Sequence, residues 1–203
     1  MIRRASETMT TEPVTPRIKL ALFRGCLAPS EALALDTDVI TFQCLQSYGV
    51  TAQNIRSTGM GPKQLKRLGC QTAYEMRSLG FDALDLVNPP FCAAMIDAFG
   101  AEEVRKAFLV SAGDAVCIAG SPAMHQLDIK PAMLLEATAG SPTHAHAVLQ
   151  QIQPRGAALF GCDAHVVLDT GLRASQLSGL GYFAKNLEDQ VKASSSDLAK
   201  LGF

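Results

Sequence analysis

The feature that most constrains the fold of this chain is a short phrase that recurs along it. The phrase is a glycine, an apolar residue, four variable residues and a second apolar residue, as in 59–65 and 80–86. In the last third of the chain it begins at Gly161, Gly171 and Gly181, a step of ten residues each time. Self-similarity at a fixed step is typical of stacked supersecondary units. The repeat predicts an architecture, and it does not by itself indicate an activity.

An earlier run of the same repeat occupies 49–87, where successive glycines are spaced by 10, 10 and 11 residues. Each glycine is placed to end one helix, and a small or helix-starting residue lies three positions later. The sixth position returns an apolar side chain to the inner face. One unit departs from this pattern, with Glu75 at the sixth position and Met76 after it, which matches the extra residue before Gly80. A helix of roughly seven residues is too short to persist alone, so the units must stack.

The remaining chain also favours helices. Capping residues and prolines near helix starts predict helices over 39–47, 91–99, 101–110, 114–119, 122–127, 131–137 and 142–151. A final short helix is expected after the serines at 194–196, ending at Gly202 and Phe203. Short strands are the alternative at 17–23 and 157–168, because short apolar runs do not separate strand from helix. The predicted fold class is therefore mostly α, a stack of short helices resembling an α-solenoid, with minor β structure as the alternative at those two places.

Three segments are expected. Residues 1–16 read as a flexible N-terminal arm, because Pro13 and Pro16 prevent a long helix. Residues 17–153 form a helical-repeat domain. Pro154-Arg155-Gly156 marks the best internal boundary, and 154–203 form a second repeat run packed on the first.

Composition excludes several classes of protein. Hydrophobic residues make up 48% of the 203 residues, too much for general disorder, and the net charge of −1 gives no overall attraction to nucleic acid. No apolar run approaches the ~20 residues of a membrane span. The six cysteines are scattered, which is typical of reduced thiols in the cytoplasm or another reducing compartment. Charge is uneven locally, at +4 over 49–80 and −5 over 81–140.

The basic stretch contains the strongest candidate site. Residues 57–68 resemble the hairpin of a helix-hairpin-helix module, whose pattern is apolar-Gly-apolar-Gly followed by a helix. The resemblance implies that backbone N–H groups at the hairpin meet a DNA phosphate and that nearby cations add charge. Departures from the family pattern are Leu65, where the family has a small residue, and Thr58, where it has an apolar one. Candidate residues for nucleic-acid or acidic-partner binding, on an exposed basic edge, are Gly59, Gly61, Lys63, Lys66, Arg67 and Arg77.

Catalytic, metal and cofactor sites are not predicted. His144, His146, Cys162 and His165 could in principle hold zinc, yet the two nearer histidines point to different faces of a helix and the spacing matches no familiar zinc site. No nucleophile motif or phosphate-binding loop occurs, so an enzyme is not expected.

The Gly-apolar repeat over 49–87 and 161–190 resembles degenerate short-helix repeats in proteins of protists, algae and large DNA viruses. That resemblance implies a stacked α architecture without implying a reaction. The expected function is a non-enzymatic scaffold or adaptor, a minor structural component of a larger assembly whose partners are other proteins. The alternative is a nucleic-acid-binding module built on the 57–68 hairpin. The sequence leaves the oligomeric state open.

Overall fold

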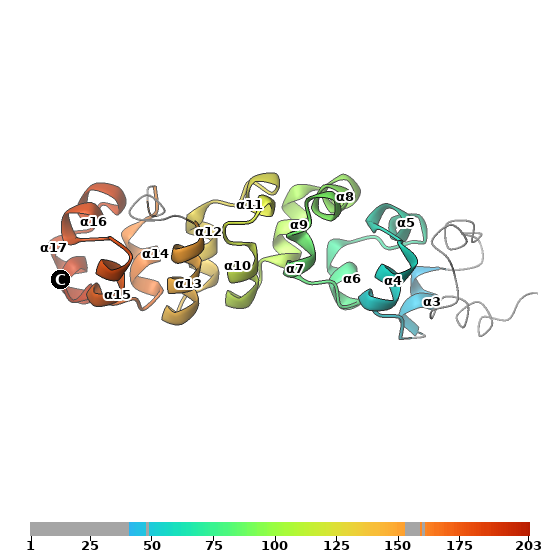
Figure 1. Cartoon of the computed structure of the whole chain (residues 1–203), viewed down its shortest axis with the longest axis horizontal. Helices are drawn as coiled ribbons and strands as arrows, with labels where there is room; N and C mark the ends of the chain where they lie inside the picture. The colour runs from blue at the N-terminus through green and yellow to red at the C-terminus, as the bar shows by residue number, and fades with distance from the viewer. Residues whose placement is uncertain (1–40, 48, 153–158, 160) are drawn as a thin grey trace, which may run out of the picture. The chain divides into compact units, whose positions relative to one another are not determined.

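The computed structural model describes residues 41–47, 49–152, 159 and 161–203. These residues form fifteen helices and no strand (Figure 1). The prediction of a mostly α stack of short helices is confirmed. The chain divides into two compact units, an N-terminal unit of Met1–Gly69 and a C-terminal unit of Cys70–Phe203.

The described part of the N-terminal unit contains three short helices. They are α3 (Phe42–Ser47), α4 (Ala52–Thr58) and α5 (Pro62–Arg67). The N–H of Phe42 donates to the carbonyl of Leu68 at 2.7 Å, so the start of α3 meets the end of α5. The fully buried apolar side chains on these helices include Phe42, Leu45, Ile55 and Leu65.

The C-terminal unit continues the series with helices that are mostly four to eight residues long. The two longest, α8 and α13, have eleven residues each. The helices are α6 (Ala73–Ser78), α7 (Ala83–Leu86), α8 (Pro89–Phe99), α9 (Ala101–Phe108), α10 (Ala112–Ile118), α11 (Pro122–Gln126), α12 (Pro131–Ala137), α13 (Pro142–Ile152), α14 (Ala164–Asp169), α15 (Ala174–Gly179), α16 (Ala184–Val191) and α17 (Ser195–Leu201).

Within the C-terminal unit, a helix commonly packs on the third helix after it. This holds for α6 with α9, α7 with α10, α8 with α11, α10 with α13 and α14 with α17. Hydrogen bonds also join helices that are distant in sequence. The N–H of Ala73 in α6 donates to Glu103 Oε1 of α9, thirty residues away. The N–H of Gly140, which follows α12, donates to the carbonyl of Asp169 at the end of α14. Three short helices therefore complete one turn of the stack, and the sequence period of ten is one third of the structural period.

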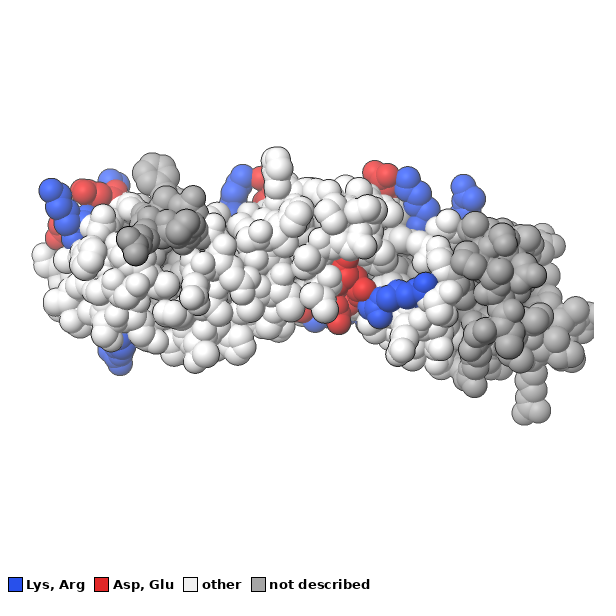
Figure 2. All heavy atoms as spheres, in the orientation of Figure 1, with Lys and Arg blue, Asp and Glu red and all other residues white. Residues whose placement is uncertain are grey.

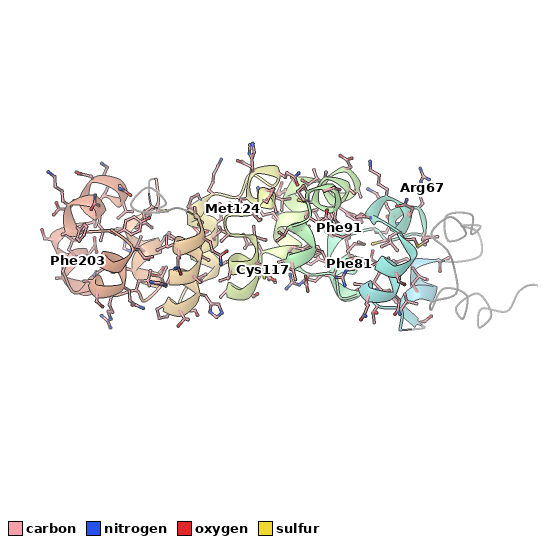
Figure 3. All side chains as sticks on the ribbon, in the orientation of Figure 1. Arg67, Phe81, Phe91, Cys117, Met124 and Phe203 are labelled. Carbon is pink, nitrogen blue, oxygen red and sulfur yellow. The ribbon has the colours of Figure 1, made fainter. Side chains whose placement is uncertain are left out.

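The threefold organisation produces rows of helices along the C-terminal unit. In Figure 1, α8 and α11 follow the upper edge of this unit, and α7, α10 and α13 follow its lower edge. Aromatic and aliphatic side chains fill the space between the rows. Phe81 and Phe91, labelled in Figure 3, stack with ring centroids 5.4 Å apart, and Met95 and Phe108 are fully buried.

The turn between repeats has one recurring geometry, which is clearest at Gly181. This residue has φ of 89°, its N–H donates to the Ser178 carbonyl, and the N–H of Tyr182 donates to the Leu177 carbonyl. That pair of bonds is the Schellman motif, which closes a helix through a left-handed residue. Tyr182 then turns inward and is buried. The same pair of bonds surrounds Gly49, Gly80 and Gly202.

The start of seven of the described helices has a second recurring bond. A polar side chain at the third helical position accepts a hydrogen bond from the N–H of the capping residue, at 2.8–3.2 Å. This is half of the capping-box arrangement, and it satisfies a backbone donor that the helix leaves over. The accepting residues are Asn54, Gln64, Glu75, Asp85, Gln176, Asn186 and Asp197.

The irregular unit after Gly69 is explained by one extra residue before its helix. Thr72, three positions after the glycine, is the N-cap of α6 instead of its first residue. Every later position of the unit moves by one, so Met76 is fully buried and Glu75 becomes the capping side chain.

The predicted helix after Ser194 is confirmed as α17, and it belongs to a further repeat unit that the sequence pattern does not reveal because the unit lacks the glycine. Lys192 has φ of 60°, one of two non-glycine residues with positive φ in the described part of the chain. It is followed by buried Ala193, the N-cap Ser194 and buried Leu198, which are the residues that the repeat requires. The second run therefore continues one unit beyond 181–190.

The strand alternative at 157–168 is wrong for its described helical portion, because Ala164–Asp169 form α14. Val167, from the Val-Val-Leu run that suggested a strand, is buried on one face of this helix. α10 begins at Ala112 instead of the predicted 114, because Ser111 caps it. The predicted arm at 1–16, the strand alternative at 17–23 and the boundary at 154–156 lie outside the described residues.

Candidate interaction surface

The predicted basic residues Lys63, Lys66 and Arg67 lie on the outer face of α5. They occupy positions i, i+3 and i+4, which share one side of a helix. All three are exposed, whereas Pro62 and Leu65 on the opposite side are buried. Figure 3 shows Arg67 on the outer side of its helix. We refer to Lys63, Lys66 and Arg67 as the basic face.

The described residues of the N-terminal unit carry charges of one sign. Residues 41–47 and 49–69 contain four cationic residues, the fourth being exposed Arg56 on α4, and no Asp or Glu. Arg56 and Lys66 are equivalent, since each lies seven residues after its glycine. Arg56 is absent from the predicted site, although this shared position is the signal that identifies it.

Gly59 and Gly61 hold the hairpin that precedes the basic face. Gly59 has φ of 72° and its N–H donates to the Arg56 carbonyl at 3.1 Å. The N–H of Gly61 donates to Gln64 Oε1 at 3.1 Å, and the following residue is Pro62, which has no N–H. The hairpin amides therefore take part in the same capping bonds as those of the other repeats.

Arg77, the last predicted site residue, belongs to the C-terminal unit and is engaged inside it. Its Nη2 lies 3.0 Å from Asp114 Oδ2, its Nη1 donates to the Ala107 carbonyl, and its guanidinium lies 5.8 Å from the centre of the Phe108 ring. Its side chain is 30% exposed and that of Asp114 is 9% exposed. Arg77 thus links α6 to α9 and α10, and it is not the freely exposed cation that the sequence predicts.

Two further arginines of the C-terminal unit make similar links between levels. Arg105 Nη1 donates to the Leu127 carbonyl at 3.0 Å, and Arg173 Nη1 donates to the Lys200 carbonyl at 3.3 Å. Each partner is a carbonyl at or just after the end of a helix, where intrahelical donors run out. Arg77, Arg105 and Arg173 therefore each bond to a later helix of the C-terminal unit or to the residue that follows one.

The face drawn in Figure 2 is nearly free of charge over α10, α13 and α15. These helices contain one Asp and no Glu, Lys or Arg, and the single Asp is the buried Asp114. Charged side chains gather instead along the upper edge, in one central group and in a small basic group at the lower left edge (Figure 2).

Two open hollows lie on the C-terminal unit. One, of about 390 Å³, lies where α8 joins α9 and is lined by Phe99, Gly100, Ala101, Glu102, Glu103 and Lys106. The other, of about 410 Å³, is lined by Gly161, Cys162, Asp163, Ala164, His165, Val191, Lys192 and Asp197.

The thiols are largely withdrawn from solvent. Burial raises the pKa of Cys70 to about 12, with a smaller contribution from nearby Glu75, and burial raises the pKa of Cys92 and Cys162 to about 11. Cys117 is exposed (Figure 3). All four are free of disulfides.

The candidate zinc residues do not meet. His144 Nδ1 lies 2.6 Å from Ser141 Oγ, and Cys162 is buried in a different repeat, just before α14. Across the described residues, no three His, Cys, Asp or Glu side chains are grouped so as to hold a metal ion.

No described helix combines the length and the hydropathy needed to cross a bilayer. Comparison of the chain with protein-family models, with curated proteins and with solved structures returns no match. The resemblance of the Gly-apolar repeat to other short-helix repeats remains a prediction.

Proposed function

We propose that this protein is a non-enzymatic scaffold or adaptor, a structural component of a larger protein assembly, and that its basic face binds an acidic protein surface. The observation that carries the proposal is the grouping of Lys63, Lys66 and Arg67 on one exposed side of α5, opposite buried Pro62 and Leu65. This grouping gives α5 an exposed surface of one charge sign, which is complementary to an acidic partner.

The architecture supports this function because stacked repeats present extended surfaces to partners. The surface is already ordered before a partner binds, because capping bonds and buried apolar side chains fix the described helices. Binding therefore loses little conformational entropy of the backbone. As part of the same proposal, the protein belongs in the cytoplasm or another reducing compartment, in keeping with free Cys70, Cys92, Cys117 and Cys162.

Nucleic-acid binding is the second candidate function, favoured by the same cluster of cations. The hairpin geometry weighs against it, because the Gly59 and Gly61 amides already donate to protein acceptors. These two amides are then engaged within the protein, and the side chains of α5 carry the charge that would attract a phosphate. The alternative therefore reduces to non-specific attraction between cations and phosphates.

The test is a pair of binding titrations followed by fluorescence anisotropy over a series of salt concentrations. One probe is a labelled peptide of alternating Glu and Gly, and the other is labelled duplex DNA. The wild type is expected to bind the acidic peptide more tightly than DNA, with affinity falling as salt rises. K63E/K66E/R67E is expected to lose at least tenfold in affinity for the peptide.

A matched control variant is K130E/K185E/K200E. It makes the same change in charge at three exposed lysines of the C-terminal unit, and it is expected to bind the peptide like the wild type. Equal loss in both variants would mean that only net charge matters, which would overturn the proposal. Tighter binding of DNA, lost in K63E/K66E/R67E, would establish the nucleic-acid alternative instead.

A further inference from the structure

The two units of the chain have opposite formal charges. The N-terminal unit, Met1–Gly69, has nine Lys and Arg and five Asp and Glu, a charge of +4. The C-terminal unit, Cys70–Phe203, has nine Lys and Arg and fourteen Asp and Glu, a charge of −5. Opposite charges on two parts of one chain make each part complementary to the other part of a second copy.

The acidic residues of the C-terminal unit are concentrated at its beginning. Residues 81–104 contain five Asp and Glu and no Lys or Arg. This segment includes α7, α8 and the first turn of α9, which pack on one another in sequence order. It is the closest counterpart in the chain to residues 49–69, which contain four cations and no anion.

The acidic segment includes the 390 Å³ hollow at the junction of α8 and α9, which could receive side chains of a partner. Phe99 and Ala101 supply half-buried apolar lining, and Glu102 and Glu103 supply carboxylates. Asp97, two residues before Phe99, is exposed. We refer to Asp97, Glu102, Glu103 and the hollow as the α8–α9 corner.

The carboxylates of the corner differ in how they are held. Glu103 Oε1 accepts the N–H of Ala73 at 2.7 Å and is therefore part of the fold. Glu102 pairs with Lys106 at 2.6 Å, with both side chains more than 60% exposed. An exposed pair of this kind contributes little to stability, so Glu102 can exchange its partner at small cost.

We propose that the basic face of one copy docks on the α8–α9 corner of a second copy. The proposal rests on the proposed function and names the acidic partner as this chain itself. Lys and Arg fit the corner because their aliphatic stems can cover Phe99 and Ala101 while their charged ends reach Glu102 and Asp97. The cations of the basic face then oppose the two exposed carboxylates Asp97 and Glu102, with Glu102 exchanging Lys106 for a cation of the second copy.

The test is sedimentation velocity of the full chain at low and high salt. We expect the wild type to associate at low salt and to dissociate at high salt, since exposed charges are screened. K63E/K66E/R67E and D97K/E102K are each expected to remain monomeric at low salt, at least tenfold weaker in association. An equimolar mixture of the two variants is expected to associate again, because each then supplies the charge that the other lacks.

The control K130E/K185E/K200E is expected to associate like the wild type. The neutral variants K63Q/K66Q/R67Q and D97N/E102Q replace either charge-reversed variant if its circular dichroism differs from that of the wild type, and each is again expected to be monomeric. A wild type that is monomeric at every salt concentration overturns the second copy as partner, as does a K63E/K66E/R67E variant that still associates. If the wild type is monomeric but binds the acidic peptide, the proposed function stands and only the second copy as partner is excluded. If the wild type neither associates nor binds the peptide, both proposals are wrong.

Discussion

Arg77 and Asp114 form an ion pair, with 3.0 Å between Nη2 and Oδ2, that joins α6 to α10 across thirty-seven residues of sequence. Asp114 also accepts the N–H of Val110, so its carboxylate holds the loop before α10 as well. The pair combines a partly exposed cation with a buried anion. Removal of Arg77 would leave the buried carboxylate of Asp114 without its cationic partner.

Arg77→Glu is expected to destabilise the protein, by about 2–3 kcal/mol, because it places a second carboxylate beside buried Asp114. Arg67→Glu makes the same chemical change on the exposed face of α5 and is expected to alter stability by less than about 0.5 kcal/mol. Chemical denaturation of the two variants measures both values. Equal stabilities would show that Arg77 is not a structural residue.

Gly120→Ala is expected to destabilise the protein for two reasons, a steric clash of the new Cβ with α13 and a left-handed backbone conformation. A Cβ at Gly120 would lie 2.7 Å from the carbonyl oxygen of Gln151, and φ there is 68°. Gly140 has a similar φ of 72° but open space around the Cβ position. The left-handed backbone costs about 1–2 kcal/mol in each variant, so thermal unfolding should show a clearly larger loss for Gly120→Ala. A loss no larger than that of Gly140→Ala would contradict the packing of α13 described above.

Lys192→Gly is expected to stabilise the protein by about 0.5–1 kcal/mol, because glycine adopts the left-handed conformation without the penalty that lysine carries. Lys185→Gly, inside α16, is the control and should destabilise by about 0.8–1 kcal/mol. The two melting temperatures should move in opposite directions. A fall in both would mean that the bond from Lys192 Nζ to the Asp189 carbonyl outweighs the backbone strain.

The buried thiols predict a loss of stability in alkali. Burial raises the pKa of Cys70, Cys92 and Cys162 above the ordinary value of 9.0, so the folded state favours the protonated thiols. Their contribution is complete below that value and falls as pH rises toward 11–12. Alkylation near about pH 8, followed by mass spectrometry, should modify exposed Cys117 before buried Cys70, Cys92 and Cys162. Equally fast modification of Cys92 in the folded protein would contradict its burial.

The helical repeat could be predicted from the sequence because its determinants are local. Gly181, Tyr182 and Leu187 form a left-handed turn and two buried positions within seven residues, and the pattern records each of them. Lys192 hid one unit because lysine does not indicate a left-handed turn. The capping residues, such as Gln64 and Asn186, were visible at a constant position and are the signal that would have found the hidden unit through Asp197.

The packing of every third helix could not be predicted in the same way. A period of ten residues states how long a unit is, and it does not state how many units complete a turn. Arg77 was assigned to a basic edge because its sequence neighbours are basic, whereas its partner Asp114 lies one structural turn further along. The exposure of Lys63, Lys66 and Arg67 followed from local amphipathicity, and here the prediction agrees with the structure.

Hydrogen–deuterium exchange of the full chain, with and without the Glu-Gly peptide, tests most directly whether the basic face is the interaction surface. We expect the bound peptide to slow exchange of amides in α5 and in the hairpin before it, while exchange in α10, α13 and α15 is unchanged. Protection confined to residues 70–203, or no protection at a saturating peptide concentration, would contradict the assignment of the basic face as the binding surface.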